Sequence, residues 1–383
     1  MLSDLYCAAP FRHLALIATV NRYRPCCMWN HEIVPPIPVT QEYPMNHEWM
    51  HQLRAHMLSG EPHDGCTKCY ASEASRDWSL RLGFNELYGR AAAADLRDIE
   101  MNFGNLCNLK CRMCGSWGSS KWIADEIKMG KMPKPLLRRT VDDIKVDFSK
   151  LEKIKFLGGE PSLEQEAILD TLQRIAAARG SLTHLSIEII TNGMVRFNDA
   201  IIELLRTCRM VHMKISMDGI GSWNEYQRTD SVWSDIEATA RFYHGFTSPS
   251  WQLIITSCIT IYTVGGVSEL CDWVTTELPL AKQILQPAFE PLQQALQNLP
   301  DGYKQKMIAA MEAWVPAPRT AAPDWLPQPR GSRDRVKKSI IWHLKQAPNC
   351  ALEAVKAQIL QLDSLRGQDL AVQNPELYAA LFD

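Results

Sequence analysis

One short stretch decides the class of this chain: Asn105-Leu106-Cys107-Asn108-Leu109-Lys110-Cys111-Arg112-Met113-Cys114. Its three cysteines have CxxxCxxC spacing and directly follow an apolar run at residues 98–103. Thiolates this close can bind one inorganic core, and thiolates are the ligands of 4Fe-4S clusters. Three thiolates leave one iron open, and an open metal position is where a substrate or cofactor coordinates. A structural zinc site is the alternative, but it needs a fourth Cys or His, and none follows within the next dozen residues.

From residue 98 onward, short apolar runs alternate with amphipathic stretches, which is typical of β-α units around a parallel sheet. The expected strands are residues 98–103, 153–157, 184–190, 211–217, 253–261 and 284–286. The expected helices between them are residues 119–129, 163–178, 199–208, 232–243 and 268–277. Six units are too few to close an eight-stranded barrel. The predicted fold is therefore an α/β fold with an open, partial (β/α)6 barrel.

Three regions are expected along the chain. Residues 1–97 have irregular spacing and five cysteines, which predicts a small cysteine-rich module. Residues 98–290 form the partial barrel, and residues 291–383 form a Pro-rich connection followed by a helical tail from about residue 337. Because prolines recur between residues 288 and 335, much of that stretch is expected to be loop.

Composition bounds the function classes. The chain has 383 residues, 46% of them apolar, and a net charge of −2, which excludes disordered, collagen-like and coiled-coil proteins. A net charge this close to zero does not indicate a polyanionic partner. No apolar run reaches about 18 residues, so no membrane partner and a cytoplasmic location are expected. In that reducing compartment the twelve cysteines favour ligands over disulfides. Four are expected in the core as small apolar residues: Cys208, Cys258, Cys271 and Cys350.

The cysteine spacing, at the end of the first strand of a partial barrel, resembles the radical SAM superfamily over roughly residues 98–290. The resemblance implies that Cys107, Cys111 and Cys114 hold a 4Fe-4S cluster whose open iron binds S-adenosylmethionine. It further implies reductive cleavage of that cofactor to a 5′-deoxyadenosyl radical, which abstracts hydrogen from a substrate. Met113 stands where the family often has an aromatic residue beside the adenine, and its sulfur offers a softer contact.

Further motifs at the ends of the expected strands resemble the family's cofactor contacts. Each falls at the strand end where β-α barrels gather their chemistry. The residues are Gly158, Gly159 and Glu160; Thr191 and Asn192; Ser216 and Asp218; and Arg228. Two glycines permit a close backbone approach to a ligand, and Glu160 offers a carboxylate to an ammonium group. Arg228 pairs either with the cofactor carboxylate or in a surface salt bridge.

The N-terminal cysteines resemble twitch and SPASM-type modules, which hold an auxiliary 4Fe-4S cluster. An N-terminal version occurs in radical SAM proteins that are common in phage genomes. The segments around Glu73 and Ser79-Leu80-Arg81, and the late stretch 362–367, resemble the same group. The expected ligands are Cys7, Cys27, Cys66 and Cys69, with Cys26 as the rival to Cys27. A zinc site made by the same four residues is the alternative.

The resemblance predicts a radical SAM enzyme, with its class open among oxidoreductase, isomerase and transferase. The auxiliary cluster is expected to assist electron transfer or substrate binding, and a small protein such as flavodoxin or ferredoxin is the expected electron donor. The expected reaction is radical modification or rearrangement of a peptide or another amino-acid-containing substrate. One alternative is a phage-type modification of a nucleotide or DNA base, such as isomerisation of an amino-acid-modified thymidine. Another is a non-catalytic iron–sulfur scaffold.

Overall fold

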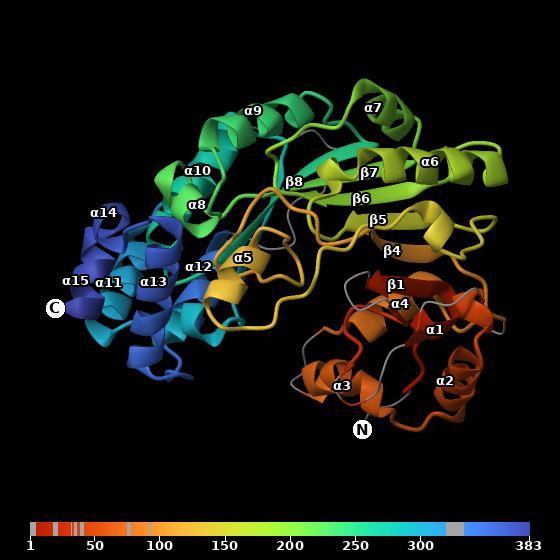
Figure 1. The fold of residues 1–383 in the computed structure, drawn as a ribbon, viewed down its shortest axis with the longest axis horizontal. Coiled ribbons are helices and arrows are strands. Elements are labelled where there is room, and N and C mark those ends of the chain that lie inside the picture. Colours follow the sequence, from red (N-terminus) through yellow and green to blue (C-terminus); the bar gives the residue numbers. More distant parts are fainter. Residues whose placement is uncertain are drawn as a thin grey trace. The chain divides into compact units, whose positions relative to one another are not determined.

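A computed structural model describes residues 5–17, 22–31, 33, 37–38, 42–74, 78–91, 93–318 and 333–383 (Figure 1). The chain divides into two units. The first contains residues 1–106, 136–189 and 197–211, and the second contains residues 107–135, 190–196 and 212–383. The CxxxCxxC loop belongs to the second unit, and the N-terminal cysteines belong to the first.

The first unit is built on a sheet with strand order β3-β2-β1-β4-β5-β6. Its strands are β1 (His13–Ile17), β2 (Arg22–Arg24), β3 (Ile37–Pro38), β4 (Asp98–Asn102), β5 (Lys153–Leu157) and β6 (Ser186–Thr191), whose last two residues lie in the second unit. Strands β1, β4, β5 and β6 run parallel, and β2 and β3 are antiparallel additions. Its helices are α1 (Ala9–Arg12), α2 (Glu48–Ser59), α3 (Thr67–Ala74), α4 (Leu80–Tyr88), α6 (Gln165–Arg179) and α7 (Asp199–Arg206).

The second unit continues the β-α alternation. Its strands are β7 (Met210–Ser216), which begins in the first unit, β8 (Trp251–Ile259) and β9 (Lys282–Pro287). Strands β8 and β9 pair in parallel over six residues. The helices of this part are α5 (Trp122–Lys128), α8 (Ser222–Gln227), α9 (Trp233–His244) and α10 (Val267–Glu277). Strand β7 alternates half-buried and buried residues along its length, as expected of a strand with two different faces.

A helical C-terminal region completes the second unit, drawn in blue in Figure 1. Its helices are α11 (Asp301–Ala313), α12 (Arg333–Leu344), α13 (Leu352–Arg366), α14 (Leu370–Gln373) and α15 (Pro375–Phe382). Their apolar residues share one core with the end of β8 and with α10, through side chains such as Ile259, Val267 and Ile359. That shared core joins the C-terminal helices to the part of the unit that carries the cysteine loop.

Short 3-10 helices link the main elements. They are η2 (Pro44–Asn46), η3 (Asp64–Cys66), η4 (Val141–Asp143), η5 (Pro161–Leu163), η6 (Val264–Gly266), η7 (Leu292–Gln294) and η8 (Leu296–Asn298). None of the helices in the described ranges is long and apolar enough to cross a membrane.

The expected α/β class, with parallel strands and a helical C-terminal region, is confirmed. Two parts differ from expectation. Strand β1, within the cysteine-rich residues 1–97, pairs in parallel with β4 of the expected barrel region. Residues 288–335 include the regular helix α11, which begins directly after Pro300, while residues 319–332 lie outside the described ranges.

Candidate active site

The three cysteines of the CxxxCxxC motif lie on a loop that folds back onto the start of α5. The Cys107 N–H donates to Ser120 Oγ at 3.3 Å, and that hydroxyl lies 3.3 Å from the Cys107 carbonyl oxygen. Trp122 Nε1 donates to the Cys111 carbonyl at 2.9 Å. The loop backbone is thus fixed by side chains at the N-terminal end of α5.

Two of the three thiols have a raised pKa. Burial raises the pKa of Cys111, and it raises the pKa of Cys114 to about 12, with a further contribution from the neighbouring Cys111 and Cys107 thiolates. Thiolates must lose their protons to bind metal, and a bound cation or cluster offsets their mutual repulsion. The thiolates of this loop therefore fit a bound cation or cluster, whose positive charge offsets their repulsion.

Asn192, on the turn after β6, reaches the cysteine loop. Its Nδ2 donates to Asn108 Oδ1 at 2.8 Å and lies 4.0 Å from Cys107 Sγ. Thr191 plays a different part, since its hydroxyl accepts from the Gly193 N–H at 3.1 Å and closes the turn. Of this expected pair, Asn192 is the residue brought to the cysteines.

Asp218 and Arg228 form a buried ion pair beside Cys111. Arg228 Nε lies 2.9 Å from Asp218 Oδ2, and Arg228 Nη2 lies 3.1 Å from Oδ1. Burial alone would lower the pKa of Arg228, but Asp218 and the Cys111 thiolate raise it above its ordinary value. Arg228 Nη1 also approaches Cys111 Sγ at 3.9 Å. The salt bridge expected as the alternative for Arg228 is present, but it is internal and adjoins the cysteine loop.

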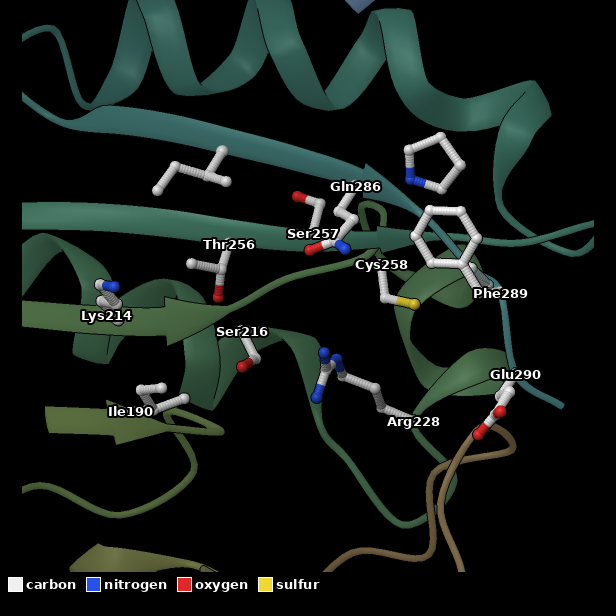
Figure 2. Close-up of a pocket in the computed structure, with 13 residues that line it drawn as sticks. Ile190, Lys214, Ser216, Arg228, Thr256, Ser257, Cys258, Gln286, Phe289 and Glu290 are labelled. Atoms are coloured by element: carbon white, nitrogen blue, oxygen red, sulfur yellow. The ribbon is translucent and has the colours of Figure 1, made fainter. Parts of the chain in front are cut away.

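A cavity of about 560 Å³ opens at the ends of β7, β8 and β9. Figure 2 shows Ser216, Arg228 and Cys258 on its walls, from β7, the end of α8 and β8 respectively. Lys214 and Glu290 supply opposite charges to the lining, and Phe289 is an exposed aromatic residue in it. This space adjoins the Asp218–Arg228 pair and is the clearest place for a small molecule in the second unit.

Cys258 corrects an expectation, because it lines the cavity and does not lie in the apolar core. It is one of two half-buried positions on β8, and its N–H donates to Asp218 Oδ1 at 2.8 Å. Burial, with Asp218 next, raises the pKa of its thiol to about 12. The signal in the sequence is the two-residue alternation of β8, which puts Thr256 and Cys258 on one face.

Comparison with known families identifies the region that carries these residues. The profile of the Radical SAM superfamily matches residues 101–225. This segment is a radical SAM domain. The match contains Cys107, Cys111 and Cys114 together with most of the expected cofactor contacts, while Arg228 lies just beyond its end. No curated protein sequence matches the chain.

Two solved structures show a weak similarity to this chain. Native anSMEcpe with bound AdoMet is 17% identical, with a TM-score of 0.41, over 56% of this chain and 59% of that chain. Streptococcus suis SuiB bound to the precursor peptide SuiA is 12% identical, with a TM-score of 0.37, over 72% of this chain and 52% of that chain. The chain thus spans less than two thirds of the length of these proteins.

The Gly158-Gly159-Glu160 motif of the radical SAM domain lies in the first unit, after β5. Gly159 N–H donates to the Gly104 carbonyl at 2.9 Å, and Glu160 N–H donates to the Leu106 carbonyl at 2.7 Å. A Cβ at Gly159 would lie 2.1 Å from Leu106 O, and Gly158 has a φ of +138°. Both glycines are therefore required by the approach of two backbone segments, before any ligand is considered. The buried Glu160 carboxylate also accepts from the Ser162 N–H at 3.0 Å.

Met113 and Arg112 take contacts that the sequence does not reveal. Met113 Sδ accepts from Gln227 Nε2 at 3.6 Å. Arg112, between two of the cysteines, buries its guanidinium against Asp363 and Gln368, which are 251 and 256 positions away. Partners so distant in sequence leave no pattern in the spacing of the loop itself.

The N-terminal cysteines assemble a second set of thiols, in the first unit. Burial and then the Cys7, Cys27, Cys66 and Cys69 thiolates raise the pKa of Cys26 well above its ordinary value. Cys7 likewise has its pKa raised to about 12, by burial and by Cys66 and Cys69. Cys7, Cys26, Cys66 and Cys69 therefore lie close enough together for their thiolates to affect the pKa of a neighbouring thiol.

Cys27 faces a different environment. It is exposed, whereas Cys26 is half-buried. Its pKa is raised to about 11 by burial and then by the carboxylate of Glu100, with Lys155 and Arg24 opposing. Cys26 and Cys27 therefore differ in exposure and in their charged neighbours. In a doublet, adjacent side chains diverge, and only the fold decides which one turns inward.

Glu73, Ser79 and Arg81 form a network behind this second set. Arg81 Nε donates to Glu73 Oε1 at 2.9 Å, and Ser79 Oγ donates to the same carboxylate. Arg81 Nη1 donates to the Tyr6 carbonyl at 2.8 Å, which fixes the backbone next to Cys7. These hydrogen bonds explain why Glu73, Ser79 and Arg81 occur together, which the sequence indicates only as a resemblance.

Within the described ranges, no group of three or more Cys, His, Asp or Glu side chains is arranged to hold a single metal ion. Both thiol sets consist of buried or half-buried cysteines, and neighbouring thiolates raise the pKa of Cys7, Cys26 and Cys114. Sulfur ligands of this kind are the donors of iron–sulfur clusters.

Proposed function

We propose that the chain is a radical SAM enzyme that cleaves S-adenosylmethionine reductively and abstracts hydrogen from a substrate in the cavity at the ends of β7–β9. The observation that carries the proposal is the buried Asp218–Arg228 pair, which lies between the Cys111 sulfur and that cavity. A cysteine loop alone fits a scaffold as well as an enzyme. A cysteine loop with a fixed cation and an adjoining cavity fits a catalyst.

The residues divide the work. Cys107, Cys111 and Cys114 would hold a 4Fe-4S cluster, and Asn192 and Ser216, in the same unit, would contact S-adenosylmethionine. When bound, these groups supply one-electron cleavage of a carbon–sulfur bond. Arg228 stays protonated at any working pH, because Asp218 and Cys111 raise its pKa. It therefore supplies permanent positive charge at the Cys111 sulfur.

A second 4Fe-4S cluster is part of the proposal, with Cys7, Cys26, Cys66 and Cys69 as its ligands. The supporting observation is the mutual rise in pKa among these thiols, together with the exposed position of Cys27. Four thiolates would close such a cluster, so that its role is electron transfer and not cofactor cleavage. A small electron donor of the flavodoxin or ferredoxin kind would serve both clusters in a reducing, cytoplasmic environment.

The substrate we favour is a peptide or another amino-acid-containing molecule. Lys214 and Glu290 place opposite charges in one cavity. An amino acid offers a carboxylate and an ammonium group to such a pair. Phe289, 58% exposed at the cavity, offers an apolar face to a side chain.

The decisive experiment is anaerobic reconstitution followed by reduction with dithionite in the presence of S-adenosylmethionine. We expect 5′-deoxyadenosine and about eight irons per chain, since each 4Fe-4S cluster contributes four. Iron uptake without any 5′-deoxyadenosine would support the scaffold instead. To assign the substrate class, peptide and nucleotide pools from cells grown in deuterium oxide would be added separately. Deuterium in 5′-deoxyadenosine from the peptide pool supports our proposal, and deuterium from the nucleotide pool contradicts it.

A further inference from the structure

The backbone of the cysteine loop is bonded to the segment that carries Arg228. Lys110 N–H donates to the Thr229 carbonyl at 3.1 Å, and Arg112 N–H donates to the Gln227 carbonyl at 2.8 Å. Gln294 Nε2 donates to the Arg112 carbonyl at 2.7 Å. The two chain segments that meet at the Cys111 sulfur are thus paired with each other along their length.

A short segment at the end of α13 holds both of them. Arg112 is 1% exposed, and its guanidinium forms an ion pair with Asp363. The same group donates to Gln368 Oε1 at 3.0 Å and to the Tyr226 carbonyl at 2.9 Å, and it lies 3.7 Å from the centre of the Tyr226 ring. The Tyr226 hydroxyl donates to Asp363 Oδ1 at 2.9 Å. Asp363 therefore bonds both to Arg112 of the cysteine loop and to Tyr226, which begins the segment 226–229 that carries Arg228.

Arg366 provides a second attachment. Its side chain is fully buried, its Nε lies 3.1 Å from Asp125 Oδ2, and its Nη1 donates to Thr229 Oγ1 at 3.1 Å. Its guanidinium also lies 4.4 Å from the centre of the ring of Trp122, the residue that donates to the Cys111 carbonyl. Gln368 Oε1 accepts from Thr229 Oγ1 at 2.9 Å.

These contacts are costly ways to join a helix to a domain. Removing charged groups from water consumes much of what an ion pair gains, and apolar residues of similar size often stabilise as well or better. Helix α13 already has apolar contacts through Val355, Ile359 and Leu362. Apolar contacts do not fix the orientation of one segment relative to the other, whereas charge-assisted hydrogen bonds do.

We propose that residues 363–368 are a positioning element of the radical site, in which Asp363 and Arg366 hold the cysteine loop and residues 226–229 in one arrangement. Neither residue is assigned contact with the cluster or with S-adenosylmethionine. Both act through Arg112, Thr229 and Trp122 on the segments that bear Cys111 and Arg228. The inference rests on the proposed function, because it assigns these residues to a cluster-binding loop.

The test uses the full chain with Asp363→Asn, which keeps the size of the side chain and removes its charge, and with Arg366→Met. Glu353→Gln is the matched control, since it removes a carboxylate from an exposed position in the first turn of the same helix. Each reconstituted protein is treated with an iron chelator. The reduced form is also followed by electron paramagnetic resonance before and after addition of S-adenosylmethionine.

We expect the iron that depends on Cys111 to be lost about tenfold faster from Asp363→Asn, because a buried charged group loses its partner. The resonance signal that responds to S-adenosylmethionine should broaden or split, which a purely structural role would not cause. Glu353→Gln should behave as wild type. Gln368→Leu removes the four side-chain hydrogen bonds of Gln368 without leaving a buried charge unpaired, and it should show the same changes, more weakly, even where Asp363→Asn fails to fold.

Variants with wild-type chelation rates and an unchanged resonance signal would overturn the positioning role and leave the proposed function intact. A wild-type chain that takes up no iron through Cys107, Cys111 and Cys114 would overturn the proposed function itself. The two failures are therefore distinguishable in one experiment.

Discussion

Two sets of thiols lie in different units of this protein and differ in what surrounds them. In the set of Cys107, Cys111 and Cys114, the Cys111 sulfur lies beside the Arg228 guanidinium, and Arg228 lines a cavity. Cys7, Cys26, Cys66 and Cys69 are accompanied by one another, with the Glu73–Arg81 pair behind them. The same donor chemistry thus occurs once in an environment suited to a reacting ligand and once in an environment suited to a closed cluster.

The two sets also differ in how they are held. Contacts within the N-terminal region support the N-terminal set, as with Arg81 and Tyr6, which are 75 positions apart. Contacts from the far end of the chain support the loop, as with Arg112 and Asp363. A site that must keep an open coordination position depends more on imposed geometry than a site that its own ligands complete.

The largest effect is expected from Cys111→Ala. Removal of one of three thiolates should abolish 5′-deoxyadenosine formation and reduce bound iron from about eight to about four per chain. Chromatography of the reaction mixture and iron analysis measure the two quantities. Cys208→Ala, at a buried cysteine outside both sets, is the control and should retain both. Formation of 5′-deoxyadenosine by Cys111→Ala would remove the distinction between an open and a closed set.

A sharper test of the N-terminal set compares Cys26→Ser with its neighbour Cys27→Ser. We expect Cys26→Ser to lose about four of eight irons while the signal that responds to S-adenosylmethionine remains, because only the closed cluster is affected. Cys27→Ser should keep all its iron, since Cys27 is exposed and faces Glu100. The opposite pattern would restore Cys27 as the ligand.

An intermediate effect is expected from Arg228→Gln. The change leaves the Asp218 carboxylate buried without its cation, so the rate of S-adenosylmethionine cleavage should fall by about 10- to 100-fold. Iron content should be unchanged, because the three thiolates remain. Lys121→Gln, at an exposed cation in the same unit, should leave the rate unchanged. If Arg228→Gln instead loses the cluster, the guanidinium belongs with the ligands and not with the cavity.

The smallest effect is expected from Glu73→Gln. Burial alone would raise the pKa of Glu73, but hydrogen bonds from Arg81 and Ser79 lower it below its ordinary value. The stabilisation is therefore present above the unfolded pKa and is lost as pH falls through the folded pKa. Urea unfolding should show a loss of about 1–3 kcal/mol at pH 7 that shrinks under acid conditions.

Glu86→Gln, on the exposed side of α4, is the matched control for that measurement and should change stability little at either pH. A deficit for Glu73→Gln that stays constant with pH would mean that packing, and not the charge, accounts for the role of Glu73.

Much of the fold was predictable because the barrel region repeats one pattern. Each strand expected between residues 98 and 287 has its counterpart, as β5 shows at residues 153–157. Strands β2 and β3 were missed because they have only three and two residues, and β1 was missed because it lies outside the repeated β-α pattern and joins the sheet through β4. Helix α11 was missed because it lies between prolines that suggested a loop.

The site was predictable where function depends on residue type and spacing, as at Cys107, Cys111 and Cys114. The site was less predictable where the role of a residue depends on the folded structure. Cys26 and Cys27 are chemically identical neighbours, and only three-dimensional packing distinguishes them. The sequence predicts Cys258 in the apolar core with three other cysteines, whereas its position on β8 places it in the lining of the cavity.

The attachment of Arg112 to Asp363 and Gln368 has a consequence for the order of events during biosynthesis. A ribosome releases residue 112 long before it releases residue 363, so the cysteine loop lacks its anchoring partners while most of the chain is still being made. The barrel strands can pair during that time. Loading of iron into the loop is therefore expected to follow completion of the polypeptide, and a chain that stops before α13 should emerge with its thiols present but its loop unset.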